Sequence, residues 1–239
     1  MNLRKVLIVV PLFILITLNS NAQQHYNSWF KTTVSYQFSQ KIKADIEFHH
    51  RNQNDVGNKN PFDKNLMNAI RTMIHYKYNE NLQFSISPFA YFSNSKIILA
   101  PNDANALPTN EYRISAFIEL QQPILKKLFI QNRTGAEYRI FPSAAANVTR
   151  IRNRLALRYE ANAKFSFMLG DELFVNASGI PALHIFDHNR IILNAGFKPT
   201  KNLKLEIGYL HSNRIPKNSN DFIFEENFLF NIWFTIPHK

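Results

Sequence analysis

Apolar and polar residues alternate one by one along much of the chain. Segment 42–49 shows the pattern, with Ile42, Ala44, Ile46 and Phe48 separated by Lys43, Asp45, Glu47 and His49. A period of two is typical of a β-strand with two different faces, because successive side chains point to opposite sides. The same alternation recurs in 70–77 and 150–159. The chain is therefore predicted to be all-β, with one apolar and one polar face.

Eight further segments are candidate strands: 28–38, 82–93, 110–121, 127–141, 171–180, 189–198, 202–213 and 222–236. Many of these are longer than the roughly 5 or 6 residues usual in soluble proteins. A strand that crosses a bilayer at a tilt needs about 9 to 11 residues. Length therefore favours a transmembrane, antiparallel, up-and-down β-barrel of 10 to 12 strands.

The count of eleven candidates is odd, whereas single-chain bacterial barrels normally have an even number of strands. We therefore expect ten or twelve strands. Either residues 28–38 pair irregularly, or a short strand lies within 94–109 or 162–188.

Connections between the candidate strands alternate in length. Short ones fall at 39–40, 79–81 and 200–201, and longer ones at 52–63, 94–109, 141–149 and 213–221. Short periplasmic turns and long outer loops are the arrangement of bacterial outer-membrane barrels. The connections thus predict hairpins that cross a membrane repeatedly.

The first 22 residues have the composition of a cleaved signal peptide. Arg4 and Lys5 precede an apolar run at 6–18, and the small residues Ser20 and Ala22 flank Asn21 at the expected cleavage site. The apolar run is shorter than the roughly 20 residues of a membrane-spanning helix. We predict a leader at 1–22 and one barrel domain at 23–239, exported to the bacterial outer membrane.

Composition limits the chemistry and the partners. The absence of Cys excludes disulfides, thiol catalysis and cysteine-bound metal. Removing Arg4 and Lys5 from 28 basic and 17 acidic residues leaves a formal charge of +9. Such a charge suits outer-membrane lipids, lipopolysaccharide and small anionic solutes, and export makes nucleic acid the least expected partner. The aromatic Phe234 near the chain end is a displaced signal for the barrel-assembly machinery.

Aromatic residues gather towards the ends of the candidate strands. A barrel carries aromatic girdles at its two membrane interfaces. We expect this position for Trp29, Tyr36, Tyr78, Tyr112, Tyr138, Phe197 and Trp233.

If the apolar faces meet lipid, the polar faces line the lumen. Fifteen basic residues would then point inward: Lys31, Lys43, Arg51, Arg71, Lys77, Arg113, Arg133, Arg139, Arg150, Arg152, Arg154, Arg158, Arg190, Lys198 and Lys204. Nine acidic residues would face them: Asp45, Glu47, Glu111, Glu119, Glu137, Glu160, Glu172, Glu206 and Glu225. The interior is predicted to be net positive.

Two hypotheses explain the ladder of Arg150, Arg152 and Arg154, which share one face of one strand. In the favoured one, they pair with Glu137 and Glu172 on neighbouring strands and fill a narrow barrel. In the other, they bind or conduct an anion. The candidate lumen network comprises Arg71, Arg113, Arg133, Glu137, Arg139, Arg150, Arg152, Arg154, Arg158, Glu160, Glu172 and Arg190.

Histidines raise the question of enzymatic activity. The candidates are His49, His50, His75, His184, His188 and His211, and none forms a recognisable arrangement of Ser, His and acid along the sequence. The spacing of His184 and His188 would suit a metal on a helix, but this segment precedes a predicted strand. Sequence motifs for nucleotides are absent. We expect no catalytic residue, no metal site and no cofactor.

Several short motifs carry a family resemblance. They are Phe186-Asp187-His188-Asn189-Arg190 and the later segment 206–211 with Gly208-Tyr209, together with Trp29, Tyr112-Arg113 and Tyr138-Arg139. With these motifs the chain resembles a family of outer-membrane proteins catalogued as domain of unknown function 2490. The resemblance implies a barrel over nearly the whole mature chain and brings no activity or catalytic residue.

These observations favour an outer-membrane barrel that is structural or forms a narrow, anion-preferring pore. The alternative from another class is a barrel hydrolase that acts on lipid or glycan at the rim. A secreted β-sandwich binding protein is the third interpretation.

Overall fold

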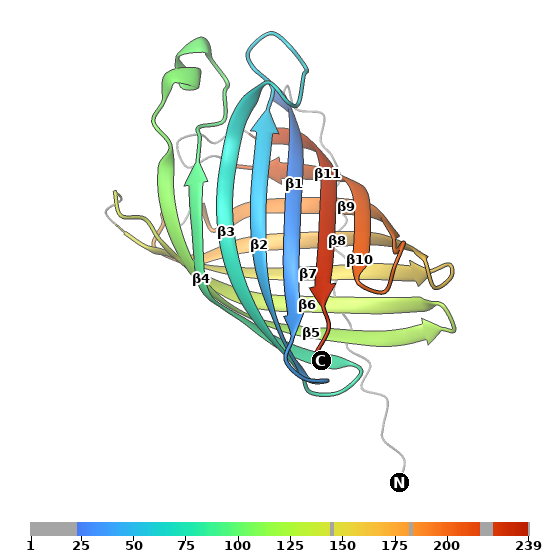
Figure 1. Ribbon diagram of the computed structural model, residues 1–239. Coiled ribbons are helices and arrows are strands. Elements are labelled where there is room, and N and C mark those ends of the chain that lie inside the picture. The colour runs from blue at the N-terminus through green and yellow to red at the C-terminus, as the bar shows by residue number, and fades with distance from the viewer. Residues whose placement is uncertain (1–22, 144–145, 182–183, 216–221, 239) are drawn as a thin grey trace.

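The computed structural model describes residues 23–143, 146–181, 184–215 and 222–238. They form one closed barrel of eleven strands (Figure 1). In chain order the strands are β1 (Gln23–Gln37), β2 (Ile42–Gln53), β3 (Lys64–Lys77), β4 (Leu82–Asn94), β5 (Thr109–Leu125), β6 (Leu128–Ile140), β7 (Val148–Glu160), β8 (Phe165–Ser178), β9 (Phe186–Phe197), β10 (Leu203–Arg214) and β11 (Ile223–Ile236). The predicted leader at 1–22 lies outside the described residues.

Every strand pairs in antiparallel fashion with its neighbour in the sequence, except where the barrel closes. There, β1 runs parallel to β11, in register from Gln23 opposite Ile223 to Tyr36 opposite Ile236. The expectation of an even number of strands is therefore wrong for the described chain. Of the two explanations considered, the irregular pairing of the first strand is the one observed. Segment 162–188 adds no extra strand, because β8 itself begins at Phe165.

Long and short connections lie at opposite ends of the barrel. The segments 54–63, 95–108, 141–147, 179–185 and 215–222 join strands at what we call the long-loop end. The segments 38–41, 78–81, 126–127, 161–164 and 198–202 join them at the short-turn end. The strands are strongly tilted, so that β5–β8 cross behind β1–β4 at a steep angle (Figure 1).

The loop between β4 and β5 contains a short 3-10 helix, η1 (Pro101–Asn105). Its Asp103 carboxylate accepts hydrogen bonds from the backbone N–H groups of Leu99 and Ala100 at 3.0 and 2.9 Å. The Lys96 ammonium, 2.5 Å away, lowers the pKa of Asp103. No helix among the described residues is long and apolar enough to cross a membrane.

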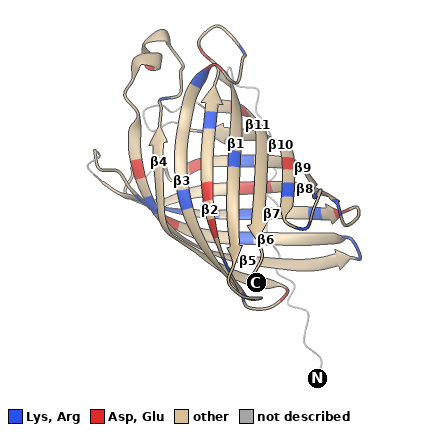
Figure 2. Ribbon diagram, in the orientation of Figure 1, with Lys and Arg blue, Asp and Glu red and all other residues tan. Residues whose placement is uncertain are grey.

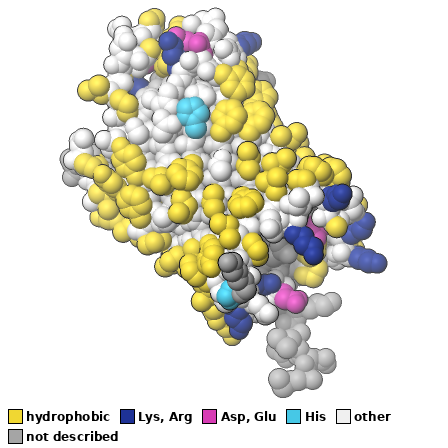
Figure 3. Space-filling model, viewed as in Figure 1, with side chains coloured by type: hydrophobic (Ala, Val, Ile, Leu, Met, Phe, Trp, Pro, Cys, Tyr) yellow, Lys and Arg dark blue, Asp and Glu magenta, His cyan; other side chains and the backbone are white. Residues whose placement is uncertain are grey.

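The two faces of the wall differ as the alternation predicts. Large apolar side chains are exposed on the outside, such as Ile46, Phe48, Ile118 and Leu193. They cover most of the face seen in Figure 3, where charged side chains gather towards its two ends. Glu47, Glu111, Glu137 and Glu172 are buried on the inside. An apolar outer band around a polar interior is the surface of a transmembrane barrel.

The predicted aromatic girdles are only partly present. Tyr36, Tyr78 and Tyr138 are exposed outside the wall, as expected. Trp29 and Trp233 instead line the interior, so their assignment to the girdles is wrong. The reason is strand parity, because Trp29 shares the face of the inward-pointing Lys31.

Candidate functional site: the charged lumen

The barrel encloses a cavity of about 720 Å³, to which all eleven strands contribute side chains. The basic residues on its surface are Lys31, Arg51, Arg71, Arg113, Arg133, Arg139, Arg150, Arg152, Arg154, Arg158, Arg190, Lys204 and Arg214. The acidic ones are Glu111, Glu119, Glu172, Glu206 and Glu225. Figure 2 marks the basic and acidic positions along the strands. The lumen surface is therefore strongly cationic.

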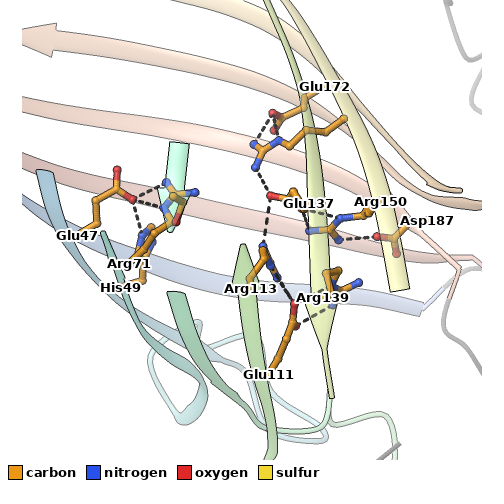
Figure 4. Close-up of polar contacts among 12 residues, drawn as sticks. Glu47, His49, Arg71, Glu111, Arg113, Glu137, Arg139, Arg150, Glu172 and Asp187 are labelled. Carbon is orange, nitrogen blue, oxygen red and sulfur yellow. Dashed lines mark hydrogen bonds and ion pairs between the residues drawn. The ribbon is translucent and has the colours of Figure 1, made fainter. Parts of the chain in front are cut away.

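Glu137 is the centre of the largest group of ion pairs. Its side chain is 0% exposed, and its carboxylate accepts a hydrogen bond from Arg150 Nε at 2.9 Å. Arg152 Nη1 donates to the same carboxylate at 3.1 Å, and Arg113 Nη1 lies 3.5 Å away. Three guanidinium groups thus surround one buried carboxylate (Figure 4).

Further carboxylates extend this group across β5–β9. Arg150 Nη1 donates to Asp187 at 2.6 Å, and Arg152 Nε donates to Glu172 at 3.0 Å. Glu111 accepts from Arg113 Nε at 2.9 Å and from Arg139 Nε at 2.7 Å. We call these residues the Glu137 network: Glu111, Arg113, Glu137, Arg139, Arg150, Arg152, Glu172 and Asp187.

Strand register explains why these side chains meet. Glu137 on β6 stands directly opposite Arg150 on β7, and Arg113 on β5 stands opposite Arg139 on β6. Side chains directly opposite each other across neighbouring strands are close enough to interact. The network therefore follows from the pairing of polar faces along consecutive hairpins.

Asp187 reaches the network through an irregularity. Phe174 pairs with His188 while Val175 pairs with Phe186, so that Asp187 is an extra residue on β9. Such a bulge locally breaks the alternation of side chains and redirects one of them. Strict alternation along β9 does not predict Asp187 as a lumenal acid, because a bulge leaves no reliable signal in the sequence.

Two arginines of the ladder pair with the carboxylates that the sequence suggested. Arg150 and Arg152 pair with Glu137, and Arg152 also pairs with Glu172. Arg154 differs, because its ion pair is with Glu119, at 3.7 Å.

Other members of the predicted network lie outside this group. Arg133 contacts Glu119 at 3.9 Å, and Arg190 contacts Glu172 at 3.8 Å. Arg158 pairs with Glu160 at 2.7 Å near the short-turn end. Arg71 belongs to a separate cluster on β2 and β3, where it pairs with Glu47. The Glu47 carboxylate also accepts a hydrogen bond from His49 Nε2 at 3.1 Å (Figure 4).

Aromatic rings inside the lumen were missed in the sequence. Phe174 has the guanidinium carbons of Arg190, Arg152 and Arg150 within 4.5, 4.8 and 4.9 Å of its ring centre. The His188 ring stacks on it at 3.9 Å. Cations close to an aromatic face are attracted by the partial negative charge that the ring quadrupole places there. The alternation of side chains along β8 could have revealed Phe174, because residues two apart on a strand share a face and Glu172 points inward.

Arg214 was also missed. It ends β10 and pairs with Glu225 at 3.0 Å. Conversely, Lys77 and Lys198 do not line the cavity, because they lie where strands meet the short turns.

The family-like motifs occupy several environments. Asn189 is turned to the outer face, where its amide donates to Asp171 at 2.6 Å. Tyr209 also lies outside and donates to Glu226. Gly208 faces inward, and a Cβ added there would come within 1.9 Å of Asn194 Oδ1. The Phe186 ring lies 6.2 Å from Phe222.

One Ser, His and Asp arrangement does occur. His75 Nδ1 is 2.8 Å from Ser85 Oγ, and His75 Nε2 is 3.0 Å from Asp45 Oδ2. Ser85 and Asp45 are only 5% and 6% exposed, and none of the three residues lines the cavity. A nucleophile must reach its substrate. This buried arrangement inside the wall therefore does not favour the rim-hydrolase alternative.

Metal ligation has no geometric basis in the part of the chain that the structure describes. No three His, Asp or Glu side chains gather there in a way that could hold an ion.

The fold and the charged lumen define a transmembrane β-barrel protein. The chain belongs to the family "Protein of unknown function (DUF2490)", whose model matches residues 26–222. No curated protein sequence matches it.

Two solved structures share the fold. The NanC porin is 11% identical with a TM-score of 0.52, over 89% of this chain and 99% of that one. The COG4313 outer membrane channel from Pseudomonas putida F1 is 13% identical with a TM-score of 0.51, over 83% of this chain and 79% of that one. At such identities the likeness concerns the fold alone.

Proposed function

We propose that the protein is a narrow, anion-preferring channel of the bacterial outer membrane. The observation that carries this proposal is the surface of the 720 Å³ cavity, which presents thirteen Lys or Arg residues and five Glu. Four more acids, Asp45, Glu47, Glu137 and Asp187, form ion pairs without lining the cavity. Counting them still leaves an excess of positive charge.

The excess of positive charge in the lumen determines which ions should pass. Charges in a narrow lumen with low-dielectric walls act on a passing ion more strongly than charges on an open surface. An anion is stabilised there and a cation is repelled, and the sign of lining charge determines selectivity in charged pores. Ion pairing reduces the field of the Glu137 network, so we expect moderate anion selectivity.

Planar-bilayer recording tests the proposal. In a potassium chloride gradient, the reversal potential should show that chloride permeates severalfold better than potassium. Arg133 and Arg154 share the single carboxylate of Glu119. Replacing both by Glu offsets the excess of thirteen basic over nine acidic residues and should abolish the selectivity. Replacing the exposed turn residue Lys126 by Glu is the matched control and should leave selectivity nearly unchanged. Cation selectivity of the unmodified protein would contradict the proposal.

A plugged structural barrel is the competing outcome, favoured by the dense ion pairs around Glu137. In that case the unmodified protein should carry no current. The double variant R152A/R154A would then open the lumen by removing both bulk and ion pairs. If the unmodified protein carries no current and this variant does, the protein is a plugged structural barrel and not a channel.

The location belongs to the same proposal. The apolar outer band supports contact with membrane lipid. We propose outer-membrane lipids and lipopolysaccharide as its surroundings and the barrel-assembly machinery as the agent of insertion. Cell fractionation should recover the protein with the outer membrane, and mass spectrometry should place its first residue near Gln23. Recovery of the cleaved protein from the soluble periplasm would contradict the proposal.

A further inference from the structure

The region around Trp29 contains positive charge that the described residues do not fully neutralise. Arg51 stacks on the Trp29 indole, with its guanidinium carbon 3.5 Å from the ring centre. The guanidinium carbon of Arg190 lies 5.2 Å from the same ring. Arg51 and Arg190 repel each other electrostatically, and Arg214 repels both. Three arginines from β2, β9 and β10 therefore gather on one side of the cavity.

Their carboxylate partners are few. Arg51 forms neither an ion pair nor a hydrogen bond with any residue that the structure describes, and feels Glu225 only at longer range. Arg190 is 3.8 Å from Glu172, which Arg152 already engages at shorter distance. Glu225 is bound to Arg214.

Unsatisfied donors accompany this charge. The Nε groups of Arg51 and Arg190 and the indole Nε1 of Trp29 are buried without a hydrogen-bond partner among the described residues. Buried donors without partners are rare and call for an explanation. A desolvated guanidinium without a counter-charge is also costly.

We propose that Arg51 and Arg190, beside Trp29, form a binding site for a small oxyanion, a carboxylate or phosphate group, inside the lumen. Guanidinium groups bind such oxyanions through paired N–H donors. Trp29 also belongs to a cluster of buried apolar side chains with Ile192, Leu210 and Leu229, which holds the indole in place. The site rests on the proposed function only in that anions must enter the lumen.

Intrinsic fluorescence provides a readout that does not need current. The chain has two tryptophans, and W233F leaves Trp29 as the reporter of the site. At constant ionic strength, replacing chloride by phosphate or acetate should change Trp29 emission and saturate. Comparing the two salts separates phosphate from carboxylate preference. R51Q in the W233F background should weaken the response by about tenfold or more, since a hydrogen-bonded charge is lost.

The other tryptophan supplies a matched control. Trp233 has Lys31 and Lys204 at 4.7 and 4.6 Å, but Lys204 is neutralised by Glu206 at 2.9 Å. In W29F, the emission of Trp233 should show no saturable response. Absence of saturation at Trp29, an equal response at Trp233, or an undiminished response in R51Q would overturn the site.

Folding is checked by heat-modifiable migration in detergent gels. Should R51Q not fold, R51K takes its place, because lysine keeps the charge but loses the planar fork. Weaker binding in R51K supports the site, and unchanged binding overturns it. A saturable Trp29 response in a protein without current would retain the site and reject the channel. Anion current without a saturable Trp29 response would retain the channel and reject the site.

Discussion

The Glu137 network and the surroundings of Trp29 use the same side chain in opposite ways. In the network, the guanidinium groups of Arg150 and Arg152 each contact two carboxylates. Beside Trp29, Arg51 rests on an aromatic ring and has no carboxylate partner among the described residues. A count of lumenal charges treats both regions alike. The comparison shows that arginines within one lumen divide into those paired with carboxylates and those, such as Arg51, without a carboxylate partner among the described residues.

The largest effect is expected where a shared carboxylate is removed. E137L leaves three guanidinium groups next to a buried apolar side chain. Breaking a buried ion pair costs about 3 to 5 kcal/mol. The free energy of unfolding, measured by denaturant titration in lipid vesicles, should fall by that amount.

A matched control for E137L is E160L. Glu160 pairs with Arg158 near the short-turn end, where its side chain is 40% exposed. Exposed pairs contribute about 0 to 1 kcal/mol. Equal losses in the two variants would mean that burial does not distinguish the network.

An intermediate effect is expected at Phe174, which lies between the two regions and contacts arginines of both. F174L keeps an apolar side chain but removes the ring face. Losing cation–π contacts in a desolvated site should lower the free energy of unfolding by about 2 kcal/mol. F228L, on the exposed outer face, is the control and should cost less than about 1.5 kcal/mol, as a conservative apolar exchange.

The smallest effect is expected for R51Q. Losing the contact with Trp29 costs stability, but removing an uncompensated charge restores some, so the two contributions offset each other. The free energy of unfolding should change by no more than about 1 kcal/mol. R150Q, treated identically, should lose several times as much. A large loss in R51Q would show that Arg51 is a structural residue like Arg150.

Much of the fold was readable from the sequence because a barrel wall repeats one simple rule. All eleven predicted strands exist, and the predicted segment 127–141 differs from β6 by one residue at each end. Alternation also predicted Glu111, Glu137 and Glu172 on the inward face, but not Asp187.

The sequence could not reveal features that depend on exceptions or on distant pairing. The bulge at Asp187 reverses the side of one residue, and Arg154 selects Glu119 rather than Glu172. Trp29 and Trp233 were assigned to the interface girdles because they are aromatic, although the alternation of side chains along their strands places both on the inward face. The parallel closure joins segments about two hundred residues apart, which no local pattern records.

The parallel pairing of β1 and β11 gives the polypeptide a net direction through the membrane. Strands in an even-numbered barrel return the chain to the side from which it started. Here the eleven crossings leave one uncompensated, so the chain enters the barrel at the long-loop rim and leaves it at the short-turn rim. The described chain therefore starts on one side of the membrane and ends on the other, as it would after a single membrane-spanning segment. Its two terminal strands must also find each other across the full length of the sequence, a non-local contact that forms slowly in folding.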